Sequence, residues 1–105
     1  MNRIALSVLS FVLLSTSLPA VPFIRGDANG DTVIDLSDAV RVVLHLFSGV
    51  LVDCEDALDV DDNESLDITD SIRILNYIFR GGAAPPAPFP AAGTDPAGAS
   101  LDCER

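Results

Sequence analysis

Two segments of the chain repeat each other, and this repeat limits the possible folds more than any other feature of the sequence. Residues 26–49 align with residues 58–81 when one segment is moved along the chain by 32 positions. The matches include acidic and apolar positions in one register, such as Asp38 with Asp70. A repeat of this length indicates one supersecondary unit used twice, in which each copy covers the apolar face of the other. We therefore predict one small domain built from two copies of one unit.

Each copy begins with an acidic loop of twelve residues, 27–38 and 59–70. Oxygen-bearing side chains stand at loop positions one, three, five, nine and twelve of both loops. Calcium takes about six to eight oxygen ligands, and a twelve-residue loop of this pattern supplies them together with the backbone carbonyl of position seven. The predicted ligands are Asp27, Asn29, Asp31, Val33, Asp35, Asp38, Asp59, Asp61, Asn63, Ser65, Asp67 and Asp70. The pattern thus predicts two Ca²⁺ ions, one per loop, and the alternative interpretation is a pair of solvated acidic turns.

Both loops depart from the usual EF-hand pattern at two positions. Position twelve is Asp rather than Glu, and position six is Thr32 or Glu64 where a glycine normally makes the sharp turn. A positive φ is strained at residues other than glycine, so we expect both sites to bind calcium more weakly than sensor proteins do. We also expect Ile34 and Leu66, at position eight, to join the loops through a short strand contact.

A helix is expected after each loop, over residues 36–47 and 69–80, so the predicted fold class is all-α. On a helical wheel, apolar residues cover roughly 200° of the first helix. Two helices packed together cover about one face of each other, so the first helix has apolar surface to spare. This surface either lies under the proline-rich flanks or forms an exposed patch that docks onto a partner.

The composition excludes several classes of function. The chain has 16 acidic and 6 basic residues and a formal net charge of −10, which argues against binding to nucleic acid or to an anionic membrane surface. It has a single His and shows no Ser/His/Asp, Cys/His, phosphate-loop or zinc constellation. We therefore do not expect an enzyme.

Residues 1–20 have the pattern of a secretory signal peptide. A positive start at Arg3 precedes an apolar run, and Leu18, Pro19 and Ala20 follow it. The run is too short to span a membrane, and a buried N-terminal helix is the alternative. We predict cleavage after Ala20, or after Ser17, and a secreted or cell-surface protein.

The C-terminal segment, residues 83–105, is rich in proline and predicts an extended arm. Phe89 lies between two prolines, and we expect it to pack the arm onto the helices, the alternative being a ligand for a proline-recognising domain. Cys54 and Cys103 are the only cysteines of a chain predicted to be exported, so we expect a disulfide between them. Free or intermolecular thiols are the alternative.

The duplicated loop resembles the type I dockerin module. The residues that carry this resemblance are the acidic motif of residues 27–38, its duplication over 59–70, and an aspartate at position twelve of each loop. The sequence also indicates no helix before either loop, as in dockerins. The resemblance covers residues 25–82, and we expect a dockerin-like domain over residues 21–82.

This resemblance implies two calcium-loop–helix repeats (F-hands) related by a pseudo-twofold axis, and docking to a cohesin domain. Dockerins commonly attach polysaccharide-degrading enzymes to secreted or cell-surface assemblies. In that family, loop positions ten and eleven and the following helix face select the cohesin. The residues that the resemblance assigns to partner binding are Leu36, Ser37, Val43, Leu44, Ile68, Thr69, Leu75 and Asn76. The alternative function is a calcium-stabilised structural or spacer domain without a dedicated partner.

Overall fold

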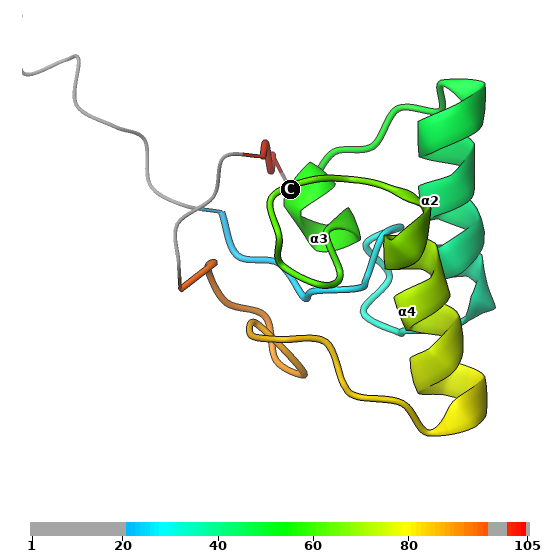
Figure 1. Ribbon diagram of the computed structural model, residues 1–105. Helices are drawn as coiled ribbons and strands as arrows, with labels where there is room; N and C mark the ends of the chain where they lie inside the picture. The colour runs from blue at the N-terminus through cyan, green and yellow to red at the C-terminus, as the bar shows by residue number, and fades with distance from the viewer. Residues whose placement is uncertain (1–20, 97–100, 105) are drawn as a thin grey trace, which may run out of the picture.

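The computed structural model describes residues 21–96 and 101–104, and this part of the chain is helical (Figure 1). Its helices are α2 (Leu36–Ser48), α3 (Glu55–Leu58) and α4 (Ile68–Arg80). No strand occurs among the described residues, as the predicted all-α class requires. Within the same residues, no helix is long and apolar enough to cross a membrane. The predicted signal peptide lies outside the described residues.

Helices α2 and α4 each contain 13 residues and have the same caps. Each begins after an aspartate at loop position nine, Asp35 or Asp67, whose carboxylate accepts a hydrogen bond from the backbone N–H two residues later. The aspartate at position twelve accepts the N–H of the cap residue, and its own N–H donates to the cap carboxylate, which completes a capping box. Gly49 and Gly81 follow the helices with φ of 72° and 65°, a left-handed conformation that favours glycine. The same local signals therefore start and end both helices.

The hydrophobic core joins the two long helices to the segment between them. Ala39 and Val42 of α2 and Ile74 of α4 are buried, and the Ser71 hydroxyl of α4 donates a hydrogen bond to the carbonyl of Ala39 at 3.0 Å. The short helix α3 ends directly before the second loop, so the expectation that no helix precedes either loop is wrong for that loop. Leu58 of α3 is fully buried in the same core.

The expected strand contact between the two loops is wrong. No backbone bridge joins Ile34 to Leu66 in the described part of the chain. Both side chains are partly buried and pack against the core instead. The two loops are therefore connected through the hydrophobic core rather than through backbone pairing.

The C-terminal segment folds back beside the residues that precede the first loop (Figure 1). Phe23 and Gly93 exchange two backbone hydrogen bonds, of 2.8 and 3.0 Å. Phe89 packs edge-to-face on Tyr77 of α4, with the ring centroids 5.6 Å apart. As expected, Phe89 thus holds the proline-rich segment against a helix.

A disulfide between Cys54 and Cys103 anchors the end of this segment next to α3. Backbone hydrogen bonds flank it on both sides: the N–H of Glu55 donates to the carbonyl of Asp102 at 2.7 Å, and the N–H of Glu104 donates to the carbonyl of Asp53 at 2.7 Å. The C-terminal residues are therefore tied to the linker between the two loop–helix units.

Candidate metal centre

The first loop gathers three carboxylates around one point. Oxygen atoms of Asp27, Asp31 and Asp38 lie within 4.8 Å of one another. The loop backbone fixes Asp27, whose carboxylate accepts hydrogen bonds from the N–H groups of Asp31 at 3.1 Å and Thr32 at 3.0 Å. The loop thus curls around the carboxylate of its first residue.

The second loop is built in the same way. Oxygen atoms of Asp59, Asp61 and Asp70 lie within 4.8 Å of one another. Asp59 accepts hydrogen bonds from the N–H groups of Asn63 at 3.1 Å and Glu64 at 2.9 Å. The two loops differ in one member of the cluster. The first loop has Asn29 at position three and Asp31 at position five, whereas the second has Asp61 at position three and Asn63 at position five.

The aspartates at position twelve are fully buried at the start of their helices. Asp38 accepts hydrogen bonds from the N–H groups of Asn29 at 3.3 Å and Asp35 at 2.8 Å. Asp70 accepts the equivalent bonds from Asp61 at 3.4 Å and Asp67 at 3.0 Å, and a further one from Val60 at 2.9 Å. Burial raises the pKa of Asp38 to about 6 and the pKa of Asp70 to about 7. The neighbouring carboxylates also raise both pKa values, whereas the backbone hydrogen bonds lower them. A carboxylate in such surroundings needs either a proton or a nearby cation.

The two clusters fit a hard metal cation. All of their candidate donors are oxygen atoms, which suits ions such as Ca²⁺ and Mg²⁺. In the second loop, Oδ1 of Asp61 is buried and has no hydrogen-bond partner. Buried acceptors of this kind are rare unless water or an ion completes the site. Each cluster could therefore hold one metal ion.

The remaining predicted ligands make other contacts. Asp35 and Asp67 cap the helices and are not members of the carboxylate clusters, and position nine of such loops often reaches its ion through water. The side-chain oxygens of Asn29 and Asn63 each accept a hydrogen bond from the N–H two residues later. All twelve ligand roles stay predictions, and the six aspartates of the two clusters are the predicted ligands whose oxygen atoms the structure brings together.

Thr32 and Glu64 adopt the expected left-handed conformation at position six, with φ of 71° and 63°. This conformation costs residues other than glycine about 1–2 kcal/mol. Both loops therefore contain a strained residue at the turn where a glycine would be relaxed.

Thr32→Gly should tighten calcium binding by the first loop by about fivefold, because roughly 1 kcal/mol of this strain is relieved. Isothermal titration calorimetry measures the change. Thr32→Ala is the matched control, since alanine removes the outer side-chain atoms but keeps the strain. If the alanine variant tightens binding as much as the glycine variant, strain at position six is not the cause.

The metal-free domain should become less stable as the pH rises from about 4 to about 7. Burial raises the pKa values of Asp38, Asp59 and Asp70 to about 6, 6 and 7, from an ordinary value of 3.8. A carboxyl whose pKa is raised in the folded state stabilises the fold below its unfolded pKa, and this contribution is lost as the pH rises through the folded pKa. Urea unfolding in a chelator should give a lower free energy of unfolding at about pH 7 than at about pH 4. Equal free energies at the two pH values would contradict this prediction.

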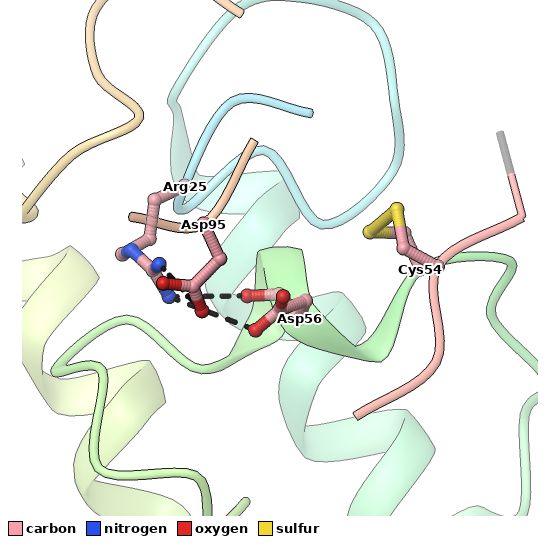
Figure 2. Close-up of a disulfide and its surroundings, with 5 residues drawn as sticks. Arg25, Cys54, Asp56 and Asp95 are labelled. Carbon is pink, nitrogen blue, oxygen red and sulfur yellow. Dashed lines mark hydrogen bonds and ion pairs between the residues drawn. A yellow bond between two sulfur atoms is a disulfide. The ribbon is translucent and has the colours of Figure 1, made fainter. Parts of the chain in front are cut away.

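The structure contains a further acidic cluster that the sequence did not indicate. Oxygen atoms of Asp56, Glu64 and Asp95 lie within 4.8 Å of one another, and Arg25 forms ion pairs with Asp56 and Asp95 (Figure 2). Burial, followed by the charge of Asp95, raises the pKa of Asp56 to about 7, although Arg25 acts to lower it. The four residues come from separate parts of the chain, so no local spacing could have revealed the cluster.

The residues assigned to partner binding differ in exposure. Leu36, Leu44 and Ile68 are exposed to 52%, 38% and 43%, and Ser37 and Thr69 are exposed as well. Leu36 and Ser37 line a hollow of about 500 Å³ at the start of α2. The residues that are only partly exposed are Val43, Leu75 and Asn76.

Four further apolar side chains are exposed on the same helices. They are Val40 and Phe47 of α2 and Ile72 and Phe79 of α4, and they match pairwise at the offset of the repeat. The helical wheel showed that these positions are apolar. Only the packed structure shows that neither the partner helix nor the C-terminal segment covers them.

Comparison of the chain with protein-family models, with curated proteins and with solved structures finds no match. The resemblance to dockerins therefore rests on the loop motif and its duplication. Any function must be argued from the chain's own residues and their geometry.

Proposed function

We propose that the chain is a calcium-binding, dockerin-like docking module of secreted or cell-surface assemblies. Two Ca²⁺ ions, one in each loop, fix the starts of α2 and α4 in two repeats related by a pseudo-twofold axis. The exposed apolar side chains of these helices then contact a protein partner of the cohesin type. The ions supply the positive charge that the buried carboxylates of both loops need.

Calcium is favoured over other ions by the chemistry of the loops. Their donors are carboxylate, amide and backbone oxygens at the spacing of a twelve-residue calcium loop, and no described thiol or imidazole is a member of either cluster. A strained position six is compatible with weak binding, and weak sites of about 10⁻⁴–10⁻³ M suffice outside the cell.

A paired set of exposed apolar side chains supports the docking role more than any other observation. Three positions of α2 and their equivalents in α4 are all exposed by 43–71%. Soluble domains rarely leave large apolar patches uncovered without a binding role. These pairs are Leu36 with Ile68, Val40 with Ile72, and Phe47 with Phe79.

Binding to immobilised type I cohesin modules, in calcium and in chelator, tests this function. The chain should bind in calcium only, because the loops that position both helices need their ions. Leu36→Glu combined with Ile68→Glu should abolish binding without loss of calcium. Leu51→Glu is the matched control, since Leu51 is 86% exposed but lies outside the helices.

Two results would contradict the proposal in different ways. Calcium-loaded chain that binds none of the cohesins would favour a structural or spacer domain. Binding that persists in chelator, or that survives both glutamate substitutions, would show that the calcium-ordered helix surface is not the docking site.

A further inference from the structure

Arg25 is a buried cation that belongs to none of the sequence motifs. Its side chain is fully buried two residues before the first loop. It nevertheless contacts the second loop: Nη1 donates a hydrogen bond to the carbonyl of Asp59 at 2.8 Å, and Nη2 lies 3.4 Å from the carboxylate of Asp62. These residues are positions one and four of that loop. The guanidinium therefore holds the first turn of the second loop from outside.

The same side chain also contacts the C-terminal segment. Nε donates a hydrogen bond to the carbonyl of Ala87 at 3.0 Å, and Nη2 lies 3.4 Å from the carboxylate of Asp95 (Figure 2). The backbone N–H of Arg25 donates to the carbonyl of Pro88 at 2.8 Å. One residue thus joins the C-terminal segment to the second loop.

The surroundings of Arg25 make this link hard to replace. Its ion pairs reach Asp56, Asp62 and Asp95, whose side chains are exposed by only 1%, 22% and 3%. Breaking a buried ion pair leaves uncompensated buried charge, which is strongly destabilising. The planar guanidinium can serve several carboxylates and carbonyls at once, whereas the ammonium group of lysine cannot reproduce its fixed fork.

At the offset of the repeat, Arg25 corresponds to Ala57, whose methyl group carries no donor. Ala57 therefore cannot hold the first loop as Arg25 holds the second. The two loops are alike in their own hydrogen bonds but differ at this supporting position. This difference predicts that the two metal sites are not equivalent.

We propose that Arg25 is a positioning residue of the second metal site, through which docking of the C-terminal segment and calcium binding by the second loop strengthen each other. This inference rests on the proposed calcium-binding function. Because the coupling is a free energy shared between two events, calcium must stabilise the docked segment by as much as the docked segment stabilises calcium.

Calcium chloride titrations of Arg25→Lys and Arg25→Gln, followed by two-dimensional NMR, test the positioning role. The amides of Gly30 and Asn63 report on the first and second loops. In both variants the second loop should lose about fivefold or more in affinity, while the first changes by less than about twofold. Arg25→Lys keeps the charge, so a loss there reflects the lost contacts.

The glutamine variant separates positioning from simple charge. Removing a positive charge near a cation site should by Coulomb's law alone tighten binding, whereas loss of positioning weakens it. Tighter binding by the second loop in Arg25→Gln would overturn the proposal. Equal losses at both loops would also overturn it, because they would indicate general destabilisation.

A reciprocal measurement leaves Arg25 intact and remains available if its variants do not fold. Hydrogen exchange at the Gly93 amide, which donates to the Phe23 carbonyl, reports on the docked segment. Calcium should slow this exchange in the wild type and in Asp38→Asn, but not in Asp70→Asn. Equal slowing in the two variants would contradict the coupling.

The wild-type titration separates failure of the calcium-binding function from failure of the role of Arg25. If neither Gly30 nor Asn63 responds to calcium, the proposed function fails, and this inference fails with it. If both amides respond but the variants do not discriminate between the loops, calcium binding stands and only the role of Arg25 is wrong.

Discussion

Asp38→Asn should abolish cation binding by the first loop, with a loss of affinity greater than about 100-fold. Asp38 is fully buried within 4.8 Å of two other loop carboxylates, so the substitution removes a direct ligand candidate. Removing an outer-shell partner of a metal site already costs about 10–100-fold. The two carboxylate oxygens of Asp38 accept hydrogen bonds from two backbone N–H groups. In asparagine one of these oxygens is replaced by an NH₂ group, which cannot accept, so one bond is lost and the start of α2 is weakened.

Calorimetry in calcium checks this prediction through the number of ions bound, which should fall from two to one. The second loop should keep its ion, because its ligand candidates lie within residues 59–70 and no backbone bridge joins the described parts of the two loops. Asp102→Asn is the control, since it removes one charge from an exposed position outside the loops. Two ions bound by Asp38→Asn would show that this carboxylate is not a ligand.

Loss of the disulfide should have the second large effect. The two cysteines are separated by 49 positions, and a cross-link over a loop of that length stabilises a folded chain by about 4 kcal/mol in the chain-entropy model. Small domains have total stabilities of about 5–15 kcal/mol, so this is a large share. Cys54→Ala combined with Cys103→Ala should therefore lower the free energy of unfolding by about 4 kcal/mol.

Urea unfolding in saturating calcium measures the effect of the disulfide. The reduced wild type serves as the comparison, because it loses the cross-link but keeps both side chains. The free energies of unfolding of the double variant and the reduced wild type should agree closely. A small difference is expected from the packing of the Cys54 side chain, which is fully buried. A change of less than about 1 kcal/mol in both would contradict this prediction, because the chain-entropy model assigns the loss to the freed unfolded chain.

The loops and the long helices could be predicted because their signals are local. Oxygen side chains at fixed spacing produced both carboxylate clusters, and an aspartate before and a glycine after each helix fixed its ends. The positive φ of Thr32 and Glu64 followed from their place at position six. Each of these features depends on residues within a single loop–helix unit.

The missed features depend on residues far apart in the chain. Helix α3 is a single short turn without a periodic pattern, and its burial depends on the helices around it. The contacts of Arg25 with Asp62 and Asp95 cross 37 and 70 positions, so no motif could indicate them. The expected pairing of Ile34 with Leu66 failed because both side chains are drawn to the common core.

We expect calcium to order this domain. A calcium titration of the metal-free chain, followed together by calorimetry and far-ultraviolet circular dichroism, tests this expectation. Two ions should bind, and the helix content should rise as they do, because unfilled loops leave buried carboxylates uncompensated at the starts of α2 and α4. A flat titration, with the full helical signal already present in chelator, would contradict this expectation.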